Sequence, residues 1–129
     1  MKPAGPHHLA IQVHDLPAME RWYRAVLGLS VLRRWPAEGG GERSVWLDLG
    51  GDAFVALERC ADPPGEAGGW ERSSPGLFVL ALRIARADRE AWESRLREQA
   101  VPVERRSPWS LFFRDPEGNR LALSHHPDE

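Results

Sequence analysis

The stretch HLAIQVHDLPAMERWYRAVLG, residues 8–28, decides the fold of this 129-residue chain. Its first seven residues alternate between apolar and polar, which predicts a strand whose buried face carries Leu9, Ile11 and Val13. Asp15 follows as a helix N-cap, and apolar residues then recur at helical spacing as far as Gly28, a residue typical of a left-handed helix end. The stretch therefore predicts a strand that leads directly into an amphipathic helix.

The rest of the chain repeats this pattern. After the first helix we expect strands at 29–34, 44–49 and 53–59, then a linker rich in Pro, Gly and Ser at 61–76. Beyond the linker the same order returns, with a strand, a helix and three strands at 77–84, 88–100, 101–105, 111–114 and 120–124. The offset from His8 to Val79 is 71 residues, and the offset from Val13 to Ile84 is the same.

The repeat predicts an α+β fold of two tandem βαβββ modules, about 7–60 and 77–124, within a single domain that spans residues 1–129. One such module cannot cover both faces of its sheet. We therefore expect the two modules together to form an open, curled sheet with a concave cleft.

Composition narrows the class of function. The net charge is −2, with acidic and basic residues interleaved, so no basic patch points to nucleic acid. No segment has the apolar length of a membrane span or a signal peptide, and the single Cys60 cannot form an internal disulfide. We expect a cytoplasmic protein without nucleic-acid or membrane partners. Six Trp residues indicate a rich aromatic core or a ligand pocket.

Two segments carry a family resemblance. The opening HLAIQVHDL (8–16) and the closing hairpin FFRDPEGNRL (112–121) resemble the vicinal oxygen chelate superfamily, which includes glyoxalases, bleomycin-resistance and fosfomycin-resistance proteins and extradiol dioxygenases. The resemblance covers about residues 8–124. It implies a homodimer, and in metal-using members it implies ligands on the first and last strand of each module. Fold alone does not assign one chemistry among these activities.

The resemblance places the four ligand positions at His8, Glu58, Val79 and Ala122. His8 and Glu58 lie on strand faces opposite the apolar residues, so both are expected to point into the cleft. Val79 and Ala122 cannot ligate a metal, and a catalytic site usually has three protein ligands. We therefore expect no essential cofactor, with a weakly held divalent metal as the alternative. Glu58 could instead pair with an arginine of the pocket, Arg83 or Arg120.

The same strand faces predict a ligand pocket. Aromatic and polar side chains expected to share it are Gln12, Trp46, Phe54, Arg83 and Trp109. Trp35 and Trp70 lie in predicted loops, where they could cover the mouth of the pocket or a partner chain.

Three functions remain open. The first is a binding protein of the bleomycin-resistance type that holds a small aromatic or amphipathic molecule. The second is a metal-dependent lyase, fosfomycin-resistance-like transferase or dioxygenase that uses His8 and Glu58. The third is a dimerisation domain without a ligand. The sequence leaves open whether the chain is an enzyme; if it is, a glyoxalase-like lyase or a dioxygenase is expected.

Overall fold

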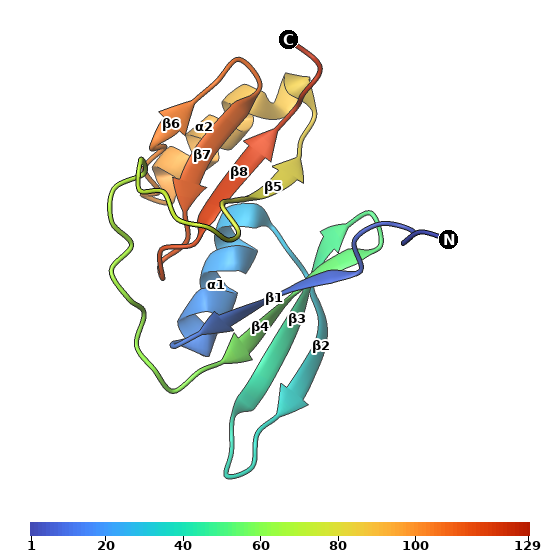
Figure 1. Cartoon of the computed structure of the whole chain (residues 1–129), viewed down its shortest axis with the longest axis vertical. Helices are drawn as coiled ribbons and strands as arrows, with labels where there is room; N and C mark the ends of the chain where they lie inside the picture. The colour runs from blue at the N-terminus through green and yellow to red at the C-terminus, as the bar shows by residue number, and fades with distance from the viewer. The chain divides into compact units, whose positions relative to one another are not determined.

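A computed structural model describes the whole chain, Met1–Glu129, and contains two four-stranded sheets and two α-helices. The chain divides into two compact units, Met1–Pro64 and Gly65–Glu129 (unit 1 and unit 2), and their boundary falls inside the predicted linker. Each unit contains one sheet and one helix, so the predicted α+β fold of tandem βαβββ modules is confirmed (Figure 1). Neither helix is both long and apolar enough to span a membrane.

Unit 1 has the predicted order of elements, although its second strand lies two residues later than the predicted 29–34. Its strands are β1 (His8–Val13), β2 (Val31–Pro36), β3 (Glu42–Gly50) and β4 (Ala53–Arg59), in the order β1-β4-β3-β2, and α1 (Leu16–Leu27) covers one face of the sheet (Figure 1). Asp15 caps α1 by accepting a hydrogen bond from the Ala18 amide, and Gly28 ends the helix at φ 70°. The fully buried side chains of unit 1 include Met19 and Tyr23 on α1 and Val13, Val45, Leu47, Val55 and Leu57 on the sheet.

An ion-pair cluster joins α1 to the edge strand β2. Glu20 on the helix accepts hydrogen bonds from both terminal nitrogens of Arg34, at 2.6 and 2.8 Å, and one from Arg24. The hydrogen bond from Arg34 lowers the pKa of Glu20 below its usual value, against the opposing effect of partial burial. The cluster therefore stabilises the edge of unit 1 as long as Glu20 is ionised.

Unit 2 repeats the topology with shorter elements. Its strands are β5 (Leu80–Arg83), β6 (Arg105–Arg106), β7 (Ser110–Arg114) and β8 (Arg120–Ser124), in the order β5-β8-β7-β6, and α2 (Arg89–Glu98) lies behind the sheet in Figure 1. A turn of 3-10 helix, Arg86–Asp88, precedes α2. Asp88 stands where Asp15 stands in unit 1, but its side chain makes no capping hydrogen bond.

Two predicted strands are corrected. The strand expected at 77–84 forms only over Leu80–Arg83, because Leu77 and Phe78 remain exposed and belong to the irregular segment before it. The strand expected at 101–105 is reduced to Arg105–Arg106. Pro102 cannot donate a ladder hydrogen bond, which is consistent with the late start of this edge strand.

The strand registers show which positions of the two units are equivalent. In unit 1, Ala10 on β1 lies opposite Ala56 on β4, and in unit 2, Ala81 on β5 lies opposite Ala122 on β8. The 71-residue offset makes Ala10 the equivalent of Ala81. Their partners on the parallel strands, Ala56 and Ala122, are therefore equivalent as well. The predicted match of Glu58 with Ala122 is therefore wrong by two residues, and Glu58 corresponds to Ser124.

Candidate functional site

An aromatic strip crosses all four strands of unit 1 on the face opposite α1. It consists of His8 on β1, Phe54 on β4, Trp46 on β3 and Trp35 on β2. His8 stacks on Phe54 with ring centroids 4.8 Å apart, and Phe54 stacks on Trp46 at 4.5 Å. Trp46 then meets Trp35 at 5.4 Å. Strand alternation explains the strip, because these residues share the face that points away from α1.

Charged and polar groups border both ends of the strip. The Arg33 guanidinium lies over the Trp35 ring at 3.7 Å, a cation–π contact. At the other end, the Nδ1 atoms of His7 and His8 share a hydrogen bond of 2.8 Å. The strip is therefore an amphipathic surface, with apolar rings in the middle and hydrogen-bonding groups at its edges.

A polar row crosses the same four strands, with one residue from each strand, and meets the strip at Trp35. Gln12, Glu58, Ser44 and Trp35 are cross-strand neighbours in that order across the sheet. Ser44 is 1% exposed and its hydroxyl has no hydrogen-bond partner. The indole nitrogen of Trp35 is also buried without a partner. Unpaired buried polar atoms are uncommon in folded proteins, so this row contains unusual unmet hydrogen-bonding capacity.

The structure does not bring the two predicted metal ligands together. His8 lies opposite Phe54 whereas Glu58 lies opposite Gln12, so His8 and Glu58 are four residues apart along the strands. At about 3.3 Å per residue this separation is roughly 13 Å, whereas ligands of one ion lie about 2 Å from it. The His8 ring is also stacked on Phe54.

The four family ligand positions, placed by register, offer one imidazole and three apolar side chains: His8, Ala56, Val79 and Ala122. No three His, Cys, Asp or Glu side chains of the chain form a group that could hold a metal ion. These residues do not fit a metal site of the kind the family resemblance implies, and ligation by His8 and Glu58 stays a prediction.

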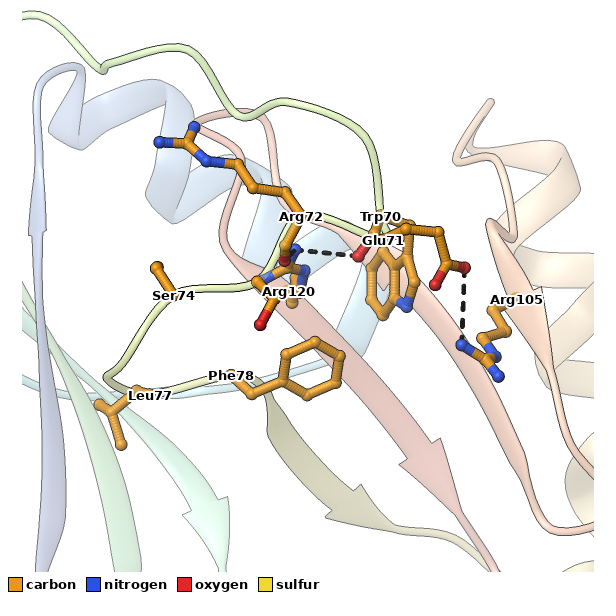
Figure 2. Close-up of a pocket in the computed structure, with 9 residues that line it drawn as sticks. Trp70, Glu71, Arg72, Ser74, Leu77, Phe78, Arg105 and Arg120 are labelled. Carbon is orange, nitrogen blue, oxygen red and sulfur yellow. Dashed lines mark hydrogen bonds and ion pairs between the residues drawn. The ribbon is translucent and has the colours of Figure 1, made fainter.

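The equivalent face of unit 2 is covered by its own chain. Residues 65–79, here named the strap, run across it before β5 begins. Trp70 of the strap is 8% exposed and packs edge-on against Phe112, the equivalent of Trp46. Arg120 donates hydrogen bonds to the backbone carbonyls of Trp70 and Arg72, at 2.9 and 2.7 Å, which fastens the strap to β8 (Figure 2).

A small pocket remains beside the strap, lined by Trp70, Glu71, Arg72, Ser73, Ser74, Leu77, Phe78, Arg105 and Arg120 (Figure 2). Its volume of about 140 Å³ is below the several hundred Å³ of typical ligand pockets. Its arginines are partly engaged, since Arg105 lies 3.6 Å from Glu71 and Arg120 stacks on Phe78. The pocket is too small for an aromatic ligand of more than one ring.

The remaining predicted pocket residues divide between the units. Gln12, Trp46 and Phe54 share the open face of unit 1, as the strand alternation predicts. Arg83 and Trp109 belong to unit 2, where Arg83 is exposed and lies opposite Ser124. Trp109 contacts His126, and its indole nitrogen is buried without a partner. Their part in a common pocket stays a prediction.

The sequence reasoning misses two members of the polar row. Trp35 is predicted to lie in a loop because the second strand is expected to end at residue 34, but β2 continues to Pro36. Ser44 is predicted on the correct face, yet a small hydroxyl gives no signal of its own. The indication available in the sequence is its parity with Trp46 on the same strand.

Comparison with known proteins identifies the fold family. The sequence profile of the Glyoxalase/Bleomycin resistance protein/Dioxygenase superfamily matches residues 5–123. Biphenyl-2,3-diol 1,2-dioxygenase 3 of Rhodococcus globerulus is 31% identical over 124 residues, which cover 90% of this chain and 60% of that protein. The chain thus spans about three fifths of the length of this relative.

Solved structures agree on the fold. A glyoxalase/dioxygenase from Nostoc punctiforme aligns with a TM-score of 0.82 at 19% identity, covering 97% of this chain and 92% of its own. A mutant of the fosfomycin resistance protein FosX from Listeria monocytogenes, in complex with Mn(II) and 1S,2S-dihydroxypropylphosphonic acid, aligns with a TM-score of 0.73 at 13% identity. That alignment covers 95% of this chain and 93% of the FosX chain. The chain belongs to the Glyoxalase/Bleomycin resistance protein/Dioxygenase superfamily.

Proposed function

We propose that the chain binds a small planar aromatic molecule on the open face of unit 1, without an essential metal ion. The observation that carries the proposal is the aromatic strip, in which His8, Phe54, Trp46 and Trp35 form a continuous series of ring contacts across the sheet. Each of these side chains is exposed or only half-buried, so the strip is not a closed core.

Ring stacking gives such a surface its selectivity. Offset aromatic pairs contribute about 0.5–1.5 kcal/mol each beyond their buried area. A ligand ring that contacts two members of the strip would gain both contacts and would bury apolar surface. Aromatic side chains beside a few hydrogen-bonding groups are typical of small-molecule sites. The surface therefore suits a flat, uncharged ring system better than an aliphatic chain.

The named relative is consistent with this class of ligand. Biphenyl-2,3-diol 1,2-dioxygenase takes its name from a two-ring aromatic molecule. Because the chain covers only 60% of that protein, its activity is not transferred here. The residues at the family ligand positions do not fit a metal, so a lyase, transferase or dioxygenase reaction through a bound ion has less support than binding alone.

Isothermal titration calorimetry with 2-methoxynaphthalene tests the proposal. We expect measurable binding that Trp46→Ala weakens at least tenfold, because the central ring of the strip is removed. Trp92→Ala is the matched control, since Trp92 is also half-buried but lies on α2 of unit 2. Absence of binding, or equal losses in both variants, would contradict the proposal and favour a domain without a ligand.

Elemental analysis of protein purified without an affinity tag tests the metal-free mechanism. We expect no stoichiometric transition metal in the wild-type protein. A metal present at one equivalent and lost in His8→Ala would contradict the proposal and favour the metal-dependent alternative.

Two further expectations, a homodimer and a cytoplasmic location, stay predictions. Light scattering of the purified chain tests whether it forms a homodimer.

A further inference from the structure

We infer that the polar row makes the proposed site selective for planar aromatic molecules that carry a hydrogen-bond donor, a hydroxyl or an amino group, with the Glu58 carboxylate as the acceptor. This inference rests on the proposed function, because the ring must first be held by the aromatic strip. It adds a residue role, the recognition of a ring substituent, that the strip alone does not supply.

Glu58 is the first reason. Its side chain is half-buried on the open face of β4, and it forms neither a hydrogen bond nor an ion pair. A partly buried carboxylate is normally stabilised by a cation or by N–H donors, because removing it from water carries a cost. Gln12, the cross-strand neighbour of Glu58 on β1, also makes no hydrogen bond. The carboxylate therefore remains available to a donor brought by a ligand.

The neighbours of Glu58 on the other side give the second reason. Ser44 lies directly opposite Glu58 on β3, and its hydroxyl is buried and unpaired. Trp35 lies opposite Ser44 on β2, with its indole N–H buried and unpaired. A buried polar group without a partner is destabilising by itself. Two adjacent buried polar atoms without partners, beside a half-buried carboxylate that forms no hydrogen bond or ion pair, are more readily explained by a missing polar group than by independent defects.

The spacing between row and strip fits a substituted ring. Ala10 and Ala56 lie opposite each other between the polar row and the His8–Phe54 pair; Ala10 is exposed, whereas Ala56 is 2% exposed. Same-face residues along a strand are about 6.6 Å apart, close to the width of an aromatic ring with one substituent. A ring stacked beside Phe54 over the exposed Ala10 would direct a substituent toward Glu58.

Unit 2 provides an internal comparison for the row. Ser110 is the equivalent of Ser44 and Ser124 is the equivalent of Glu58. In unit 2 the two hydroxyls satisfy each other, with Ser110 donating to Ser124 at 2.8 Å. The side chains at these two positions are thus hydrogen-bonded to each other in unit 2, whereas Ser44 and Glu58 are not hydrogen-bonded to each other in unit 1. The unmet hydrogen bonds are therefore a property of the unit 1 residues and not of the topology.

Three naphthalene probes separate the possibilities in calorimetric titrations of the full chain. They are 2-naphthol, which can donate, 2-methoxynaphthalene, which cannot donate, and 2-naphthoate, which carries a negative charge. We expect 2-naphthol to bind about tenfold more tightly than 2-methoxynaphthalene, since a hydrogen bond to a charged group has roughly this effect. We expect 2-naphthoate to bind most weakly, because its carboxylate faces that of Glu58.

The Glu58→Gln and Glu58→Ala variants identify the acceptor. Either change should reduce the preference for 2-naphthol to about twofold or less, while the affinity for 2-methoxynaphthalene stays the same. Glu58→Gln should also improve binding of 2-naphthoate by relieving the repulsion. Ser124→Ala, the matched change in unit 2, should leave all three affinities unchanged.

The two proposals fail in different ways. If 2-methoxynaphthalene binds through Trp46 but 2-naphthol binds no more tightly, the inference about the polar row is wrong and the proposed function stands. If 2-naphthol is preferred equally in wild-type protein and in both Glu58 variants, Glu58 is not the acceptor and the inference is overturned. If none of the three probes binds, both proposals fail.

Discussion

The open face of unit 1 and the same face of unit 2 share a topology and differ in what lies over them. In unit 1, stacked rings remain at least partly exposed beside a row of unpaired polar groups. In unit 2, Trp70 of the strap covers Phe112, and Ser110 is paired with Ser124. The serine pair and the aromatic face are therefore covered by intramolecular contacts in unit 2, whereas in unit 1 the equivalent positions retain contacts that a ligand can complete.

The largest difference is expected between two tryptophans. Trp70→Ala should lower the free energy of unfolding by about 3–5 kcal/mol, because a nearly buried indole and its contacts with Phe78 and Phe112 are lost. Trp46→Ala should cost much less, since Trp46 is half-buried on an open face. Urea unfolding of both variants measures the two values, and equal losses would show that the strip is structural.

The two helix caps give the next contrast. Asp15→Ala should destabilise the protein by about 1 kcal/mol, since the Asp15 carboxylate accepts the Ala18 amide hydrogen bond at 3.1 Å. Asp88→Ala should change stability little, because Asp88 makes no capping hydrogen bond. Chemical denaturation followed by circular dichroism tests both, and a larger loss for Asp88→Ala would contradict the cap assignment.

The two serines at equivalent positions should respond in opposite ways. Ser110→Ala removes the hydrogen bond to Ser124 and should cost about 1 kcal/mol of stability. Ser44→Ala removes a buried hydroxyl that has no partner, so stability should stay equal or rise slightly. Thermal unfolding of the two variants measures the difference. A clear loss of stability in Ser44→Ala would mean that its hydroxyl is satisfied in solution.

The smallest effect is expected at the ion-pair cluster of unit 1. The pKa of Glu20 is lowered in the folded protein, so its contribution is present above the unfolded-state pKa and disappears as the pH falls through the lowered folded value. Glu20→Gln should cost about 0.5 kcal/mol at neutral pH and almost nothing in strong acid. Unfolding measured across this pH range tests it, and a pH-independent loss would contradict the assignment.

The sequence was sufficient to predict the order of helices and strands and which face of each strand is buried. The alternation in 53–59 predicted β4 with its correct ends, and Asp15 and Gly28 marked the ends of α1. It was not sufficient for the equivalence of the two halves. A strand pattern has a period of two residues, so a shift of two residues leaves every side chain on the same face. The pairing of β4 with β1 is needed to show that Ala56, and not Glu58, occupies the ligand position.

The strap could not be predicted for a different reason. Residues 61–76 have the composition of a linker, and no local signal indicates that Trp70 will pack on Phe112, which lies far along the chain. His125 likewise follows the last strand, where a free tail was expected, yet it is 2% exposed and contacts Arg89. Contacts between distant segments depend on shape complementarity, which composition does not encode.

The parallel pairing of β1 with β4 also affects how unit 1 is synthesised. His8 meets Phe54 and Val13 meets Arg59, so the first strand has no partner until the ribosome has released residues beyond 59. Closing such a long loop is slow compared with forming α1. The nascent chain therefore carries an apolar, unpaired strand for most of the synthesis of unit 1, the kind of segment that chaperones bind.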